Sequence, residues 1–370
     1  MKCNWKECTL GDLITFQRGH DLPKSQMING KYPVVGSNGI IGYHNEYTTE
    51  APSITIGRSG NVGNPYIVYG RTWSHNTTLY VKDFKGNDPV FVYYFLKTMD
   101  LANYAGGSAV PTLNRNHIHT LPIEVPEGVG VQKKIGYYLR LFDEKIELNN
   151  EINNNLEQQA QAIFANEFLS LDTLPEGWKQ ASLIDIADYL NGLAMQKYRP
   201  TADESGIPVL KIKELRQGCC DDNSELCSPS IKSDYIIHDG DVIFSWSGSL
   251  LVDLWCGGIC GLNQHLFKVT SSKYDKWFYY AWTKHHLDRF VAVAADKATT
   301  MGHIKRDELA KAEVLIPNEA DYNRIGALLQ PIYEMIISNQ IENKKLAATR
   351  DTLLPKLMNG EIDMSEVDYE

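Results

Sequence analysis

The sequence lacks several features that would assign it to a secreted, membrane or zinc-binding class of protein. Its seven cysteines in 370 residues are an odd number, unlike a disulfide framework, and no two have Cys-x-x-Cys spacing. No run approaches the roughly 18 apolar residues of a membrane span, and the first residues lack the apolar core of a signal peptide. We therefore expect a cytoplasmic protein with reduced thiols, no metal and no membrane role. A zinc site shared by the five cysteines between residues 219 and 260 is the alternative.

Catalytic motifs are lacking as well. The sequence has no P-loop and no glycine-rich cofactor loop between a strand and a helix. Ser59 with His75, and Ser247 with His265, come without the acidic residue or nucleophile-elbow pattern of a catalytic triad. We expect no catalytic residues and no enzymatic activity in this chain.

The chain also lacks an excess of positive charge. Its formal net charge is −10, and residues 1–130 hold 11 Lys and Arg against 10 Asp and Glu, so the acidity lies in the rest of the chain. A protein that binds DNA alone by neutralising phosphates is usually basic. This chain therefore either binds no nucleic acid or binds it with help from a basic partner.

Two long stretches share a heptad pattern in which two asparagines interrupt an apolar seam. The spacing alternates between four and three residues, which predicts two long helices that pack on each other. The first seam is Ile135, Leu139, Phe142, Ile146, Asn149, Asn153, Leu156, Ala160 and Ile163, and the second is Ile325, Leu329, Ile332, Ile336, Asn339, Asn343, Leu346, Arg350 and Leu353. Because a buried Asn can fix the register of a coiled coil, we expect the two asparagine pairs to align. Pro331 should kink or break the start of the second helix.

The segments between these helices also repeat. Trp5-Lys6 returns as Trp178-Lys179, and the strand-like segment 53–60 returns as 241–248. The offset grows from 173 to about 190 residues, so the second copy carries insertions, notably around residues 218–233.

The predicted architecture is an α+β fold with a pseudo-two-fold internal repeat. Two mixed α/β globular domains are separated by two long helices that form an antiparallel coiled coil. We expect the first domain at 1–128, the central helix at 129–170, the second domain at 171–318, and the C-terminal helix and tail at 319–370.

The whole chain resembles the specificity subunit of type I restriction–modification systems. The residues that carry the resemblance are Leu10–Leu13, Gly57–Gly63, Gly240–Ser249, Leu262–Val269, Thr299–Leu309 and Leu353–Asp363. The resemblance implies two target-recognition domains that read an asymmetric, bipartite site on double-stranded DNA. It also implies two methyltransferase partner subunits, and in some systems two restriction or motor subunits. S-adenosylmethionine would bind the methyltransferase and not this chain. An adenine methyltransferase would also need an Asn-Pro-Pro-Tyr loop to hold the target base, and the similar segment here, Gly63-Asn64-Pro65-Tyr66, lacks the second proline.

The alternative function is a two-domain coiled-coil scaffold without a nucleic-acid role, which the acidic charge favours. A scaffold would keep similar loops in both copies, whereas here the loops differ while the helices and strand ends match. We therefore favour a reader of DNA.

The predicted DNA-binding residues are polar side chains on loops, which can reach base edges or phosphates. In the first domain they are Ser37, Asn38, Arg58, Ser59, Gly60, Asn61, His75, Asn76, Thr112, Asn114 and Arg115. In the second they are Lys211, Lys213, Trp246, Ser247, Ser249, Asn263, Gln264, His265, Lys297, Thr299, Thr300, His303 and Lys305. Any one of them could equally be a solvated or turn-forming residue.

Overall fold

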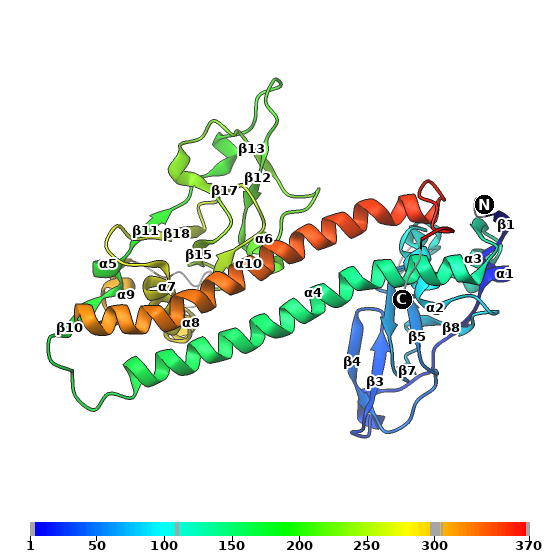
Figure 1. Ribbon diagram of the computed structural model, residues 1–370, viewed down its shortest axis with the longest axis horizontal. Coiled ribbons are helices and arrows are strands. Elements are labelled where there is room, and N and C mark those ends of the chain that lie inside the picture. The colour runs from blue at the N-terminus through cyan, green and yellow to red at the C-terminus, as the bar shows by residue number, and fades with distance from the viewer. Residues whose placement is uncertain (1–3, 108–110, 297–303, 305, 368–370) are drawn as a thin grey trace. The chain divides into compact units, whose positions relative to one another are not determined.

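The structure is a computed structural model that describes residues 4–107, 111–296, 304 and 306–367. Its contacts divide the chain into two units (Figure 1). The first unit contains residues 1–145 and 346–370, and the second contains residues 146–345. Two long helices, α4 (Val129–Phe164) and α10 (Glu319–Met358), contribute residues to both units.

The first unit contains a two-stranded, a three-stranded and a four-stranded sheet. The strand orders are β1-β9, β4-β3-β7 and β2-β8-β5-β6. The strands are β1 (Trp5–Thr9), β2 (Thr15–Arg18), β3 (Tyr32–Gly36), β4 (Gly39–His44), β5 (Ser53–Gly57), β6 (Pro65–Val68), β7 (Trp73–Ser74), β8 (Thr78–Asp83) and β9 (Pro122–Pro126). The short helices are α1 (Leu10–Leu13), α2 (Pro89–Lys97) and α3 (Arg115–His119).

The second unit repeats this topology with one added strand, β14, which pairs with β17. Its sheets have the orders β10-β19, β13-β12-β17-β14 and β11-β18-β15-β16, and β12 is parallel to β17 as β3 is to β7. The strands are β10 (Lys179–Ser182), β11 (Asp188–Asn191), β12 (Ile207–Leu210), β13 (Leu226–Cys227), β14 (Ile236–Ile237), β15 (Asp241–Ser245), β16 (Leu251–Trp255), β17 (Cys260–Leu262), β18 (Leu266–Thr270) and β19 (Glu313–Ile316). The helices are α5 (Leu183–Ile186), α6 (Ile212–Gln217), α7 (Lys276–His285), α8 (Leu287–Asp296) and α9 (Arg306–Ala310). The predicted α+β fold with an internal repeat is confirmed.

Matching local signals explain why the two units begin alike. Thr9 and Asp12 form a capping box at the start of α1, and Ser182 and Asp185 form the same box at α5. Each box satisfies backbone N–H groups that a helix start leaves without partners. The predicted insertion near residue 218 is occupied by the end of α6, a loop and β13.

Each unit has its own apolar core. In the first, Phe91, Tyr94 and Phe95 of α2 are buried against the four-stranded sheet and α4. In the second, every side chain of α7 from Trp277 to Thr283 is buried. A helix that is apolar on most of its surface is stable only inside a core, so α2 and α7 are the helices around which the two cores are packed.

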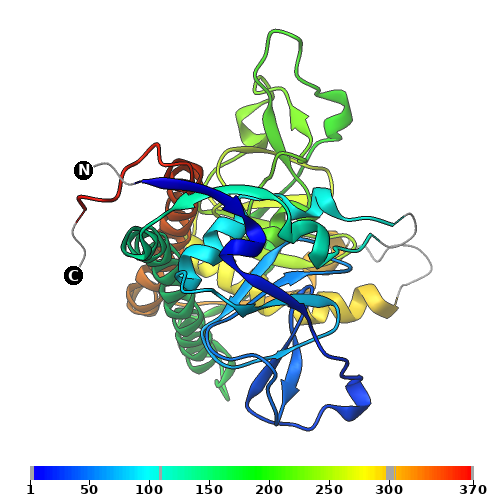
Figure 2. The same cartoon turned by 90° about the vertical axis from the view of Figure 1, so that its right-hand side faces the viewer.

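The end of the chain completes the core of the first unit. Leu354, Leu357, Met358 and Met364 are buried in the same cluster as residues near the N-terminus. Gly360 has a positive φ of 74°, and a Cβ there would lie 2.7 Å from the Trp5 indole nitrogen. Figure 2 shows the red C-terminal tail close to β1, drawn in dark blue.

The asparagine layers face each other in the second unit. Asn149 Nδ2 donates to Asn343 Oδ1 at 2.8 Å and to Glu342 Oε2 at 2.8 Å. Asn339 Nδ2 donates to Asn153 Oδ1 at 2.8 Å. These pairs run in opposite directions along the two helices, so the expected antiparallel packing holds for this segment.

Pro331 does not end helix α10, contrary to the expected break. The helix runs without interruption from Glu319 to Met358, and Pro331 is exposed. Loss of one backbone hydrogen bond at a proline is offset because Leu329 and Tyr333, on either side, are buried in the core.

No helix among the described residues is both long and apolar enough to cross a membrane.

Replacing Asn149, Asn153, Asn339 and Asn343 together by Leu should give a folded second unit that is more stable. Asn149 Oδ1 is buried without a hydrogen-bond partner among the described residues, and such a group costs about 1–3 kcal/mol. We expect the free energy of unfolding to rise by a similar amount in urea titrations. The register should become less defined, since apolar layers slide more easily than polar ones. A quadruple variant that unfolds at lower urea than the parent would contradict this, and the exposed Asn154→Leu is the control outside the seam.

Candidate nucleic-acid interface

Three predicted loops of the first unit converge on Thr77. The Ser37 N–H donates to Thr77 Oγ1 at 3.3 Å, and His75 Nδ1 lies 3.1 Å from the same oxygen. The N–H groups of Arg58 and Ser59 donate to the Thr77 carbonyl at 2.8 and 3.2 Å. Loops that follow β3, β5 and β7 therefore meet at one end of the sheets. Thr77 itself gave no signal in the sequence, because its role depends on three loops that are distant along the chain.

The segment around Thr112 joins the same surface. The Leu113 N–H donates to the Arg58 carbonyl at 2.9 Å, and Asn114 caps α3 by accepting the Asn116 N–H at 3.0 Å. A hollow of about 330 Å³ is lined by Arg18, Arg58, Leu79, Thr112, Leu113, Asn114 and Arg115. We refer to it as the arginine hollow. Arg18, the last residue of β2, was not among the predicted DNA-binding residues. It differs from its counterpart in the second copy, Asn191, and this difference could have pointed to it.

His119 lies beside this surface and does not add to its positive charge. Its Nε2 accepts the Phe16 N–H at 3.0 Å, which requires that nitrogen to be unprotonated. Burial, and then the nearby charge of Arg115, lower the pKa of His119. The positive charge beside His119 therefore comes from Arg115 and Lys85 and not from the imidazole.

Other predicted residues of the first unit have local partners. The Asn61 side chain accepts a hydrogen bond from Asn64, and the Asn76 side chain donates one to Asp21. Gly60 has a positive φ of 85°, and Asn38 is exposed in the tight turn before β4. The structure thus brings Ser37, Arg58, Ser59, His75 and Thr112 together and holds Asn61 and Asn76 in local hydrogen bonds.

The second unit carries a different set of side chains on the same backbone frame. The Ile304 N–H donates to the Trp246 carbonyl at 3.0 Å, as Leu113 does to Arg58. Trp246 Nε1 donates to Asn191 Oδ1 at 3.0 Å, and its ring stacks on Phe267 with centroids 5.6 Å apart. Trp246 therefore occupies the place of Arg58, and Asn191 the place of Arg18.

The predicted loop residues near Trp246 are tied to one another. Ser247 Oγ lies 3.1 Å from His265 Nδ1, and Gln264 Nε2 lies 3.3 Å from His265 Nε2. Asn263 is buried, with its Oδ1 accepting the His265 N–H at 3.2 Å, so it shapes the turn beneath the surface. Ser249 Oγ accepts a hydrogen bond from Arg216 at 3.4 Å, which places α6 beside this surface.

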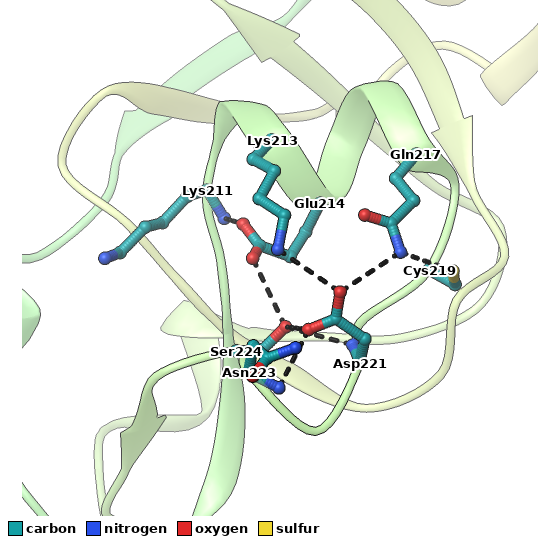
Figure 3. Close-up of polar contacts among 8 residues, drawn as sticks. All are labelled: Lys211, Lys213, Glu214, Gln217, Cys219, Asp221, Asn223 and Ser224. Carbon is teal, nitrogen blue, oxygen red and sulfur yellow. Dashed lines mark hydrogen bonds and ion pairs between the residues drawn. The ribbon is translucent and has the colours of Figure 1, made fainter. Parts of the chain in front are cut away.

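The two predicted lysines of α6 are paired with carboxylates. Lys211 Nζ lies 2.6 Å from Glu225, and Lys213 Nζ lies 3.2 Å from Asp221. Figure 3 shows the Asp221 carboxylate bound by both Lys213 and the Gln217 amide. Hydrogen bonding to Lys213 lowers the pKa of Asp221, which keeps the pair ionised. Because these lysines are neutralised within the unit, they are weaker candidates for phosphate contacts than Arg18, Arg58 and Arg115, which have no ion-pair partner among the described residues.

Five predicted residues, Lys297, Thr299, Thr300, His303 and Lys305, lie outside the described residues. Where the structure describes the chain, no three His, Cys, Asp or Glu side chains gather as metal ligands. In those same parts, no carboxylate forms a hydrogen bond with His75 or His265.

The fold and these surfaces define a class of protein with two copies of one domain. Each copy presents different polar side chains at matching positions of its own loops. The chain belongs to the family of type I restriction modification DNA specificity domains, whose model matches residues 2–158 and 175–347.

Individual relatives agree with this assignment. The chain is 28% identical over 306 residues to the type I restriction enzyme MjaIX specificity subunit of Methanocaldococcus jannaschii, covering 75% of this chain and 70% of the relative. It is 19% identical over 356 residues to the HindI specificity subunit of Haemophilus influenzae, covering 74% and 77%. The crystal structure of a type I restriction-modification S subunit from M. genitalium has the same fold, with a TM-score of 0.62, 15% identity and 96% coverage of both chains.

Proposed function

We propose that this chain is the subunit that selects the DNA target of a type I restriction–modification complex. Each unit reads one half of an asymmetric, bipartite site on double-stranded DNA. The observation that carries this proposal is that the two units share the order of their matching strands and matching backbone hydrogen bonds but differ in the side chains they present. Such a difference is expected when two copies of one domain read different sequences, because base edges are recognised by side chains.

We propose two methyltransferase subunits as partners, and two restriction or motor subunits in complexes that also cleave. In this proposal the partner subunits carry out the chemistry and this chain selects the target. The complex acts in the cytoplasm. The scaffold alternative does not account for the three arginines that line one hollow of the first unit and have no ion-pair partner among the described residues. The acidic charge of the chain is compatible with DNA binding if the partner subunits supply most of the phosphate contacts.

The proposal predicts the pattern of DNA methylation. In cells that express the partner methyltransferase, sequencing that detects methylated adenines should find a two-part motif with an unread gap when this chain is present. The motif should vanish when the gene is deleted and return with a plasmid copy. Methylation that is unchanged by the deletion would contradict the proposed function.

S-adenosylmethionine should bind the methyltransferase partner and not this chain. Calorimetric titration of the purified chain should therefore release no binding heat, whereas the assembled complex should. Stoichiometric binding to the chain alone would contradict this division of roles.

A further inference from the structure

Three arginines line the arginine hollow of the first unit. Arg18 ends β2, Arg58 follows β5 directly, and Arg115 begins α3. None of the three forms an ion pair or a side-chain hydrogen bond with any residue that the structure describes. By contrast, Arg71 of the same unit pairs with Glu50 at 2.8 Å. Like charges around one hollow repel each other, so this arrangement suits a ligand that supplies hydrogen-bond acceptors.

Arg58 differs from the other two because its backbone is held on both sides. Its N–H donates to the Thr77 carbonyl at 2.8 Å, and its own carbonyl accepts the Leu113 N–H at 2.9 Å. Arg58 is also half-buried, whereas Arg18 and Arg115 are exposed. A side chain that starts from a fixed, partly buried backbone loses less conformational entropy on binding. It is therefore better suited than a mobile one to discriminate between bases.

The planar guanidinium matches a pair of acceptors in one plane. In the major groove, guanine presents N7 and O6 in this arrangement, and arginine bound to both is the commonest specific contact between a protein and a base. Phosphate oxygens offer similar acceptors but carry no sequence information. An arginine that binds guanine and an arginine that binds phosphate should therefore respond differently to mutation.

We propose, on the basis of the function proposed above, that Arg58 reads a guanine in the half-site of the first unit. Arg18 and Arg115 bind the phosphates on either side of it. In the second unit the same place is occupied by Trp246, whose only side-chain N–H already donates to Asn191. An indole cannot bind both guanine acceptors, so the second half-site is read there by a different contact.

The test uses the full chain in complex with its methyltransferase and compares Arg58→Ala, Arg58→Lys, Arg18→Ala and Arg115→Ala. For Arg58→Ala, one guanine of the first half-site should become degenerate in the methylation motif. Affinity for the parent site should fall about 5- to 150-fold. Arg58→Lys keeps the charge but not the two-pronged geometry, so it should lose discrimination while retaining affinity for random DNA. The second half-site should stay unchanged.

Arg18→Ala and Arg115→Ala should keep the motif and weaken binding to every sequence alike. Each should reduce the slope of log affinity against log salt by about 1. Arg71→Ala is the matched control, because this arginine is already paired and lies outside the hollow. It should change neither the motif nor the slope.

A chemical probe separates base from phosphate. Replacing the guanine by 7-deazaguanine removes N7. This should lower the DNA affinity of the parent complex and leave the DNA affinity of the Arg58→Ala complex unchanged. The proposal is overturned if Arg58→Ala retains the guanine preference, or if it weakens all sequences equally. If Arg58→Ala does not fold, Arg58→Lys decides by the same criteria. A parent complex that methylates without sequence preference would instead refute the proposed function.

Discussion

Removing one matched heptad from each long helix should shorten the unread gap of the target by about 3 base pairs. The pairing of Asn149 with Asn343 and Asn153 with Asn339 sets the register, by which residues 146–152 correspond to 340–346. Deleting both segments leaves the heptad spacing of the two helices in phase and keeps the Asn153–Asn339 layer. Seven helical residues span about 10 Å, which corresponds to about 3 base pairs at 3.4 Å each. Both half-site sequences should be unaltered, because no loop of either unit is changed.

The gap is measured from the methylation motif of cells that carry the double deletion. Deleting only 146–152 is the control, since it places the remaining asparagines opposite apolar residues and should abolish activity. An active double-deletion protein with the original gap would show that the partner subunits, and not these helices, set the spacing.

Exchanging residues 15–121 for the equivalent segment of another family member should replace the first half-site completely. The exchanged segment contains the arginine hollow and Thr77 with its loops. The β1–β9 pair and the start of α4, which complete the core of the unit, remain those of the parent. The methylation motif should combine the donor's first half-site with the parent's second half-site and gap.

The reciprocal exchange of residues 188–312 tests the second unit in the same way. It removes Asn191, Trp246 and His265 together and should change only the second half-site. A change in both half-sites after either exchange would mean that the units do not read DNA independently.

The helices and the repeat could be predicted from the sequence because their signals are local. Heptad spacing identified the asparagine layers, which the structure pairs at 2.8 Å. Of the kink or break expected at Pro331, the break does not occur, because the burial of Leu329 and Tyr333 outweighs the loss of one hydrogen bond. A helix that is anchored by tertiary contacts can tolerate a residue that would end it in isolation.

The candidate site was predicted only in part, because its geometry depends on residues that are distant in sequence. Strand ends with small polar residues pointed to Arg58, Ser59 and Thr112. They could not indicate that all of these loops meet at Thr77. Arg18 and Asn191 differ within otherwise matching segments, each just before a glycine, so a position-by-position comparison of the two copies would have identified them. The ion pairs of Lys211 and Lys213 could not be foreseen, since their partners lie on an inserted loop.

The use of both chain ends in the first unit has a consequence for synthesis on the ribosome. The core residues of the second unit lie between Ala160 and Ile336, so all of them are synthesised before Leu354, Leu357 and Met364 of the first unit's core. The first unit must wait for Leu354, Leu357 and Met364, although most of its residues are made first. Domains of nascent chains usually fold from the N-terminus onward. Here the first unit cannot complete its core first, and it exposes apolar surface until Leu354, Leu357 and Met364 have emerged, which makes it a natural substrate for chaperones.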